Sequence, residues 1–258
     1  MKVLITAGGT REDIDSVRSI VNNSTGQLGS IIAGEFAKHG AEITYVCGVN
    51  AALPSIKNIV IIPIKNVQNL SHTLEEQLSL HKFDCVIHSM AVSDYTPNAV
   101  LSVDDVVANI LAVMDKHTDI EAHIRNAIAK AYKPIDEGKI SSKHPELLIS
   151  LKQTPKIIRQ IKTQQPDTVL VGFKLLSGVP EEELMRAAKN LLTKNSCNFV
   201  LANDQQNINK DTHKAILINK TGIIQRAGTK HEIAAAIYNA ITKRQANQPC
   251  KEHGPATQ

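Results

Sequence analysis

The sequence predicts an α/β fold in which a mostly parallel sheet carries helices on both faces. Short aliphatic runs, typical of buried parallel strands, alternate along the chain with segments of helical apolar spacing. Such alternation favours a parallel sheet with right-handed crossovers. Of the 258 residues, 42% are apolar, which is enough for a sizeable core built almost entirely from aliphatic side chains.

The opening forty residues set this pattern. Val3–Ile5 predict a buried strand, a polar loop follows, and apolar residues recur at helical spacing from Leu28 to Ala37. Further strands are predicted at residues 42–46, 58–63, 84–88, 147–151, 168–175 and 198–202. Further helices are predicted at residues 66–80, 154–161, 180–193 and 231–244, with two more inside 104–132. Residues 214–219 and 223–226 flank Lys220-Thr221-Gly222 and predict a C-terminal β-hairpin.

Residues 1–244 are expected to form a single domain with a helical insert and a flap at 104–150. Thr154 is the expected N-cap of the helix at 154–161, with Pro155 in the first turn. Residues 133–143 are polar and rich in chain breakers, which predicts a mobile loop. Residues 245–258 are polar, contain two prolines and are expected to be disordered.

Charge and cysteine content argue against several classes of protein. The net charge of +4 is mild, and no basic cluster with interleaved aromatic residues suggests nucleic-acid binding. The four cysteines, at positions 47, 85, 197 and 250, lie far apart without a C-x-x-C pair, so neither a zinc site nor a disulfide framework is indicated. The N-terminus leads directly into a strand, and no apolar run approaches the ~20 residues of a membrane span. We therefore expect a cytoplasmic protein that binds no nucleic acid and no membrane.

Two pairs of glycines flank the polar loop between the first strand and the first helix. Gly8 and Gly9 close the strand, and Gly26 and Gly29 open the helix. Unpaired N–H groups and the helix dipole attract anions there, and glycine lets a ligand approach the main chain, so the pattern favours phosphate binding. The spacing is neither G-x-G-x-x-G nor a Walker A loop, because sixteen residues separate Gly9 from Gly26 and no Gly-Lys-Ser/Thr follows. The alternative, in which Gly8 and Gly9 form an ordinary turn and Asn23 or Ser24 caps the helix, stays open.

Four ordered stretches resemble a known family. They are T-A-G-G-T-R-E-x-I-D-x-V-R from Thr6 with N-x-S-T-G-x-x-G from Asn22, A-V-S-D-Y-x-P at 91–97, V-G-F-K-L at 171–175 and A-N-D at 202–204. In these motifs the chain, to about Tyr238, resembles the phosphopantothenoylcysteine synthetases of coenzyme A biosynthesis. The motif sequences are most similar to those of the stand-alone bacterial type. The resemblance implies a Rossmann-like fold and a family-like homodimer.

The resemblance also implies a reaction. A nucleotide-dependent ligase of this family joins 4'-phosphopantothenate and L-cysteine through an acyl nucleotidylate, and releases nucleoside monophosphate and pyrophosphate. The similarity to the stand-alone type favours CTP over ATP as the co-substrate. Mg²⁺ is expected to arrive with the triphosphate, because the sequence has no acidic cluster with ligand spacing and hence no predicted metal site made by the protein alone.

Two residues are expected to be catalytic. By resemblance, Asn22 orients the acyl carbonyl and binds the oxyanion of the tetrahedral intermediate, and Lys139 lies on a flap and helps to pass the activated acyl group to cysteine. The predicted substrate and nucleotide contacts are Gly8, Gly9, Ser24, Gly26, Gly29, Ala91, Asp94, Phe173, Lys174, Lys189, Lys194, Asn203 and Asp204. Lys189 and Lys194 are five residues apart where fused relatives have two lysines four apart, so the lysine that reaches the triphosphate stays open.

Two functions of another kind remain as alternatives. A dinucleotide-binding reductase would need a compact glycine fingerprint and an acidic residue near the end of the second strand, where this chain has Cys47-Gly48-Val49-Asn50. A non-catalytic nucleotide-binding protein would leave Asn22 and Lys139 without a role.

Overall fold

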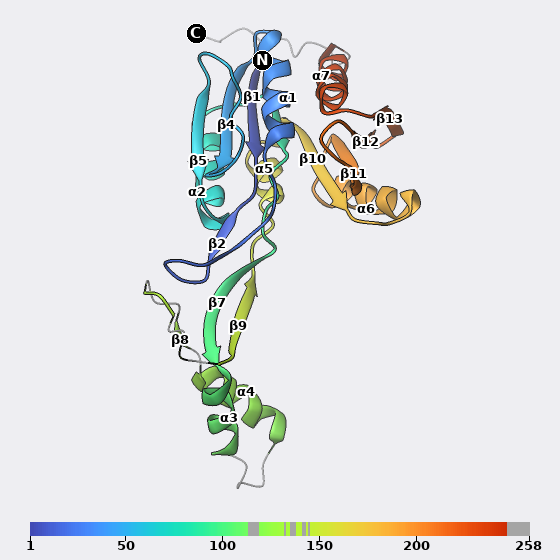
Figure 1. Cartoon of the computed structure of the whole chain (residues 1–258). Coiled ribbons are helices and arrows are strands. Elements are labelled where there is room, and N and C mark those ends of the chain that lie inside the picture. Colours follow the sequence, from blue (N-terminus) through green and yellow to red (C-terminus); the bar gives the residue numbers. More distant parts are fainter. Residues whose placement is uncertain (113–118, 132, 135–137, 141–142, 144, 247–258) are drawn as a thin grey trace, which may run out of the picture.

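The computed structural model describes residues 1–112, 119–131, 133–134, 138–140, 143 and 145–246. Its centre is an eight-stranded sheet with the order β13-β12-β11-β10-β6-β1-β4-β5 (Figure 1). These strands are β1 (Lys2–Ala7), β4 (Glu42–Gly48), β5 (Val60–Ile64), β6 (Cys85–His88), β10 (Val169–Leu176), β11 (Phe199–Ile208), β12 (His213–Asn219) and β13 (Gly222–Ala227). The six strands from β11 to β5 are parallel, and β12 and β13 are antiparallel. The predicted mostly parallel sheet and the C-terminal hairpin are confirmed.

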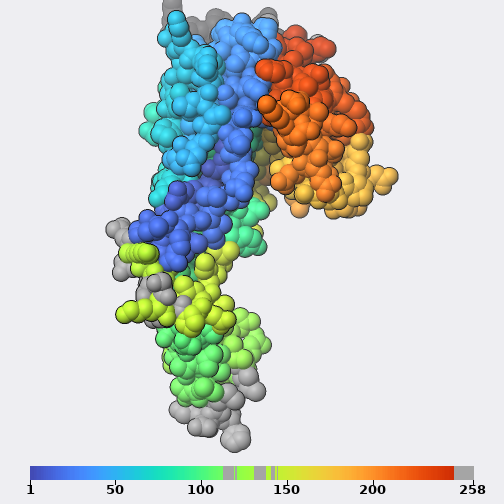
Figure 2. Space-filling model, in the orientation of Figure 1, coloured from blue at the N-terminus to red at the C-terminus, as the bar shows by residue number. Residues whose placement is uncertain are grey.

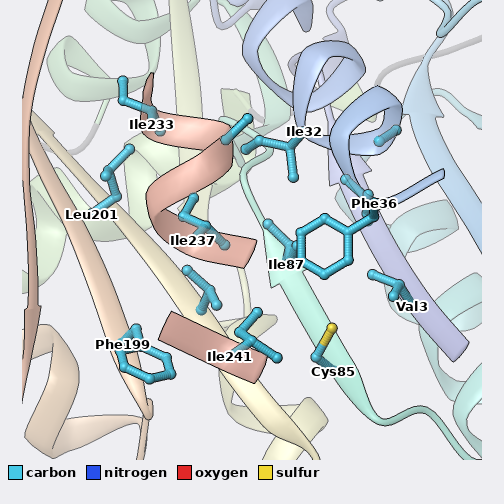
Figure 3. Close-up of a cluster of buried hydrophobic side chains, with 14 of the residues drawn as sticks. Val3, Ile32, Phe36, Cys85, Ile87, Phe199, Leu201, Ile233, Ile237 and Ile241 are labelled. Atoms are coloured by element: carbon cyan, nitrogen blue, oxygen red, sulfur yellow. The ribbon is translucent and has the colours of Figure 1, made fainter. Parts of the chain in front are cut away.

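Helices cover both faces of this sheet because successive strand residues point to opposite sides. Val3 and Ile5 pack with α1 (Gln27–Lys38) and α7 (Lys230–Ala246), whereas Leu4 packs on the other face. That other face is covered by α2 (Val67–Leu80), α5 (Ile158–Gln164) and α6 (Glu181–Lys194). Figure 3 shows the first of these two cores, with Phe36 of α1 and Ile237 of α7 pointing toward Ile87 of β6. Cys47, Cys85 and Cys197 are buried in the two cores, and Cys250 lies outside the described residues.

An arm extends from the body beyond the carboxyl edge of the sheet (Figures 1 and 2). It consists of β7 (Tyr95–Ser102), β8 (Lys133–Pro134) and β9 (Leu147–Gln153), followed outward by α3 (Val103–Leu111) and α4 (Ile120–Ala131). The two helices expected inside 104–132 are therefore present. At the root of the arm, the Thr154 hydroxyl donates to the backbone oxygen of Ser93 at 2.6 Å, and the Thr10 hydroxyl donates to Ser93 Oγ at 3.0 Å.

The polar loop after Gly9 contains a hairpin that the sequence did not predict. Its strands are β2 (Arg11–Asp13) and β3 (Ser19–Val21). The buried Glu12 carboxylate accepts a 2.9 Å hydrogen bond from the backbone N–H of Val67, the first residue of α2. Because carboxylates stabilise helix N-termini, this contact fixes the hairpin to the body.

Three expectations about local structure differ from what is observed. Thr154 is not the N-cap of α5, which begins at Ile158, because its hydroxyl is used by Ser93 instead. β11 continues through residues 203 and 204, which were expected to follow the strand. Residues 245 and 246 belong to α7, and the rest of the predicted tail lies outside the described residues. Of the predicted mobile loop at 133–143, only residues 133–134, 138–140 and 143 are described.

Both ends of the described chain lie at the amino edge of the sheet (Figure 1). Met1 precedes β1, and its backbone oxygen accepts from the N–H of Glu42, where β4 begins. Arg244, near the end of α7, shares a surface pocket with Asn198, which immediately precedes β11.

Candidate active site

The strand order reverses at β1 and β6, so a ligand is expected at the carboxyl ends of these two strands. Chain order runs outward from β1 through β4 to β5, then returns to β6 on the other side of β1 and continues to β10. In open α/β sheets, ligands bind where the strand order reverses in this way. The segments that follow these two strands are hydrogen-bonded to each other: Ala91 N–H donates to the Gly8 oxygen at 2.8 Å, and Thr10 N–H donates to the Ala91 oxygen at 3.1 Å.

The glycines at this edge are required by geometry. Gly8 has φ = +82°, a conformation that favours glycine. A Cβ on Gly9 would lie 2.2 Å from the Asn22 backbone oxygen, and a Cβ on Gly29 would lie 2.5 Å from the Cβ of Ala7. Gly8 and Gly9 thus let the loop close over β1, and Gly29 lets α1 pack tightly on the same strand.

The start of α1 lacks a strong side-chain cap. Its N-cap is Gly26 at φ = +72°, which has no side chain, and the nearest substitute is Thr25 Oγ1, 3.4 Å from the N–H of Gln27. Neither Asn23 nor Ser24 caps the helix. The free N–H groups and the helix dipole therefore leave this helix start able to bind an anion.

Asn22 lies between the glycine turn at Gly8 and Gly9 and the start of α1. Its side-chain Nδ2 donates to the Ala91 oxygen at 3.2 Å, and its backbone oxygen accepts from Ser24 N–H at 2.8 Å. A cleft of about 310 Å³ opens beside it, lined among others by Gly9, Asn22, Asn23, Ser24 and Thr25. The structure thus brings together Gly8, Gly9, Asn22, Ser24, Gly26, Gly29 and Ala91 from the sequence-predicted set.

Asp94 lies at the base of the arm. Lys139 lies on a short segment, residues 138–140 (the Lys139 segment), that faces the β2–β3 hairpin. The exposed Asp94 carboxylate forms an ion pair with Lys156 Nζ at 2.6 Å, a partner that the sequence analysis did not identify. The two residues are 62 positions apart, so no local pattern could have signalled this contact. Lys139 is exposed, and the next residue, Ile140, is hydrogen-bonded to Asp15 and Arg18 of the hairpin turn.

The lysines of the second half of the chain lie in different places. Phe173 and Lys174 are half-buried in the carboxyl half of β10, and Phe173 packs on the core beneath α1 and α7. Lys189 and Lys194 are exposed on α6, which runs from the carboxyl end of β10 back to the start of β11. Asn198 N–H donates to the Leu170 oxygen near the start of β10, so Lys194 lies at the opposite end of the sheet from Gly8. Lys174 is therefore better placed than Lys194 to reach the carboxyl edge.

Asn203 and Asp204 are held by internal contacts. The Asp204 carboxylate accepts from the N–H groups of Gln206 at 2.9 Å, Gly178 at 3.0 Å and Val179 at 3.3 Å, and these bonds lower its pKa below the usual range. Asn203 Nδ2 lies 3.0 Å from the ring Nε2 of His213. Both residues line a second cavity, of about 420 Å³, that is separate from the Asn22 cleft.

His88 is a titratable residue at the edge that the sequence analysis did not single out. It ends β6, is almost completely buried, and its Nδ1 lies 2.9 Å from the Thr6 hydroxyl of β1. Burial lowers its pKa to about 4, so the ring is neutral at neutral pH. The sequence feature that could have identified His88 is its position at the end of the largely apolar strand predicted at residues 84–88.

Comparison with known proteins identifies the family. The family model described as "DNA/pantothenate metabolism flavoprotein C-terminal domain" matches residues 1–103 and 99–245, nearly the whole chain. The chain belongs to this family. A solved member of the same kind, the DNA/pantothenate metabolism flavoprotein from Streptococcus pneumoniae, is 36% identical with a TM-score of 0.80 and is covered over 96% of this chain and 100% of that one.

Curated relatives of this flavoprotein C-terminal domain are longer proteins. The coenzyme A biosynthesis bifunctional protein CoaBC of Thermococcus kodakarensis is 30% identical over 94% of this chain and 51% of the relative. That of Haemophilus influenzae is 31% identical over 95% and 52%. This chain therefore spans about half the length of these relatives. A structure of a Cab2 variant in complex with phosphopantothenate-cysteine, 16% identical with a TM-score of 0.66 over 95% of this chain and 88% of that one, shares the fold.

The described part of the chain contains neither a helix able to span a membrane nor a cluster of metal ligands. Within the described ranges, no helix is both long enough and apolar enough to span a bilayer. In the same part of the chain, no three or more His, Cys, Asp or Glu side chains gather into a potential metal site.

Proposed function

We propose that this chain is a ligase that joins 4'-phosphopantothenate to L-cysteine in coenzyme A biosynthesis, driven by a nucleoside triphosphate. The observation that carries the proposal is the meeting of the Asn22 amide, the uncapped start of α1 and the turn at Gly8 and Gly9 on the edge where the strand order reverses. The relatives named for coenzyme A biosynthesis support it, as does the fold shared with the Cab2 variant bound to phosphopantothenate-cysteine.

The chemistry has two steps. In the first, the carboxylate oxygen of phosphopantothenate attacks the α-phosphorus of the nucleotide, and pyrophosphate leaves. In the second, the cysteine amine attacks the acyl carbonyl, loses a proton, and displaces nucleoside monophosphate. The protein contributes mainly by positioning the reactants and neutralising charge.

The residues at the edge suit these demands. The backbone N–H groups at the start of α1 and in the glycine turn can donate hydrogen bonds to phosphate oxygens and so stabilise their negative charge. Asn22 Nδ2 is a neutral donor that can turn from the Ala91 oxygen to the acyl oxygen, where negative charge develops. Lys139, a cation on the segment facing the hairpin, assists the second step. Lys174 is the lysine we assign to the triphosphate.

Mg²⁺ is proposed to enter with the triphosphate. The amide and hydroxyl oxygens of Asn23, Ser24 and Thr25 around the cleft are hard ligands of the kind that suit a cation already bound by phosphates and water. When bound, the ion would neutralise charge on the pyrophosphate leaving group. We favour CTP over ATP, on the similarity of the chain to the stand-alone bacterial type.

The experiment is an assay of pyrophosphate release with each substrate omitted in turn. Release that requires phosphopantothenate together with CTP or ATP, and formation of phosphopantothenoylcysteine only when cysteine is added, supports the ligase. Comparing the two triphosphates in this assay decides the nucleotide. Hydride transfer to or from a nicotinamide, or nucleotide binding without any turnover, would favour one of the two alternatives and refute the proposal.

We also propose that the chain forms a homodimer through its arm. The arm exposes several large apolar side chains, at Tyr95, Val107, Leu111, Leu148 and Leu151. Exposed apolar patches of this kind commonly mark protein interfaces. Light scattering of the purified protein should give twice the chain mass, and Leu148→Lys should shift it toward the monomer; a monomeric wild-type protein would refute this.

A further inference from the structure

The turn of the β2–β3 hairpin is built around a fully enclosed carboxylate. The Asp15 side chain has no exposed surface and accepts hydrogen bonds from the backbone N–H groups of Val17 at 2.9 Å and Arg18 at 2.7 Å. The Arg18 guanidinium adds two more, from Nε at 3.0 Å and Nη2 at 2.6 Å. The hydrogen bonds from Arg18 hold the pKa of Asp15 well below its usual range, so the pair stays charged at neutral pH.

The Asp15–Arg18 ion pair also binds the backbone N–H and C=O groups of Ile140, the residue that follows Lys139. Ile140 N–H donates to Asp15 Oδ2 at 3.1 Å, and Arg18 Nη2 donates to the Ile140 oxygen at 3.2 Å. One such bond would leave the segment free to pivot, whereas two bonds to opposite sides of a residue fix both its position and its rotation. Lys139 is the residue immediately before this point.

The hairpin is itself firmly attached to the body. Arg11 N–H donates to the Lys65 oxygen at 2.7 Å, Glu12 holds the first turn of α2, and the Lys65 ammonium forms an ion pair with Asp13. Its second strand, β3, leads directly into Asn22. One small element therefore connects the residue proposed to orient the acyl carbonyl with the segment that carries the proposed flap lysine.

We infer that Asp15, together with Arg18, is a positioning residue that docks the Lys139 segment on the β2–β3 hairpin and so places Lys139 relative to Asn22. This inference rests on the proposed function for its catalytic meaning, but the docking itself does not. Asp15 contacts no substrate in this scheme and acts through the backbone of Ile140.

The docking is tested first without any substrate. Hydrogen exchange of wild-type protein should show the Ile140 amide protected, because it donates to an enclosed carboxylate. Trypsin should cut the Lys139–Ile140 bond slowly, and about tenfold faster in Asp15→Asn, relative to the Lys220–Thr221 bond in the exposed β12–β13 turn. Glu121→Gln, which breaks the exposed Glu121–Arg125 pair of α4 (2.8 Å), is the matched control and should leave both rates unchanged.

The catalytic consequence is tested by separating the two half-reactions. In Asp15→Asn, the first-turnover burst of pyrophosphate should stay within about threefold of wild type, while conversion of the acyl nucleotidylate to product slows by about tenfold to a hundredfold. Arg18→Lys keeps the charge but loses the fork that reaches the Ile140 oxygen, and should give a smaller effect in the same direction. A merely structural role would slow both half-reactions together.

The outcomes are distinguishable. An unprotected Ile140 amide in the wild-type protein overturns the docking, whether or not the variants fold. Protection and faster trypsin cleavage, with equal slowing of both half-reactions, overturn the positioning role. Protection and faster cleavage in a protein with no ligase activity support the docking and refute the proposed function instead.

Discussion

Replacing Gly9 by alanine tests whether the edge of the sheet depends on the close approach of two backbones. The added Cβ would lie 2.2 Å from the Asn22 backbone oxygen and 3.4 Å from the Asn22 Cβ. Because the first contact is with backbone, no side-chain rotation can relieve it. The loop must open by about 1 Å, which is a displacement that can reduce turnover by about 100-fold when it affects a catalytic group.

We therefore expect Gly9→Ala to lower the free energy of unfolding by about 1–3 kcal/mol, the usual penalty of overpacking, and to lower kcat by about 100-fold. Gly34→Ala is the matched control, because a Cβ on Gly34 of α1 meets no atom within 4 Å. That variant should be as active as wild type and more stable by about 0.5–1 kcal/mol, as for glycine to alanine within a helix. The measurements are urea unfolding and pyrophosphate release. Wild-type kcat in a Gly9→Ala protein would show that the displacement does not reach Asn22 and would refute the reasoning.

Substitutions of the two proposed catalytic residues and of the buried His88 give further tests. Asn22→Ala should keep the fold and lose about 3 kcal/mol of transition-state stabilisation, seen as a fall in amide formation of about 10²–10³-fold; near wild-type turnover would remove Asn22 from the mechanism. Lys139→Gln should let the acyl nucleotidylate accumulate, and mass spectrometry of a single turnover without excess intermediate would count against a role in the second step. The low pKa of His88, about 4, means that between about pH 6.5 and 4 the unfolded chain binds a proton there that the folded protein does not. Lowering the pH through this range should therefore decrease the free energy of unfolding by about 3 kcal/mol. His88→Gln should remove that part of the pH dependence, and identical pH dependence of urea unfolding in the two proteins would contradict the assignment.

The sheet and its helices could be predicted from sequence because their signals are local. Val3–Ile5, the strand at 168–175 and the helix at 180–193 each carry their own periodicity, and the structure has all three within a few residues of the expected bounds. The alternation of such segments was sufficient to predict a mostly parallel sheet, which the structure has.

The arm and the hairpin could not be predicted in this way because their stability comes from distant partners. β7 pairs with β9 although 44 residues separate the two strands, and the Glu12 carboxylate accepts a hydrogen bond from Val67 at the start of α2. Thr154 had the residue type and position of an N-cap, but a nearby backbone oxygen, that of Ser93, competed for its hydroxyl. Most residues at the edge could therefore be predicted from the sequence, whereas the ion pairs of Asp94 and Asp15, which connect the edge to neighbouring segments, could not.

The position of Met1 in the described structure has a practical consequence. Met1 and the last turn of α7 are both on the side of the sheet away from Gly8 and the arm. A tag or a surface linker joined at Met1 would therefore start on the side of the sheet opposite the cleft beside Asn22. Protein immobilised through its N-terminus should for this reason keep the proposed turnover of the free form.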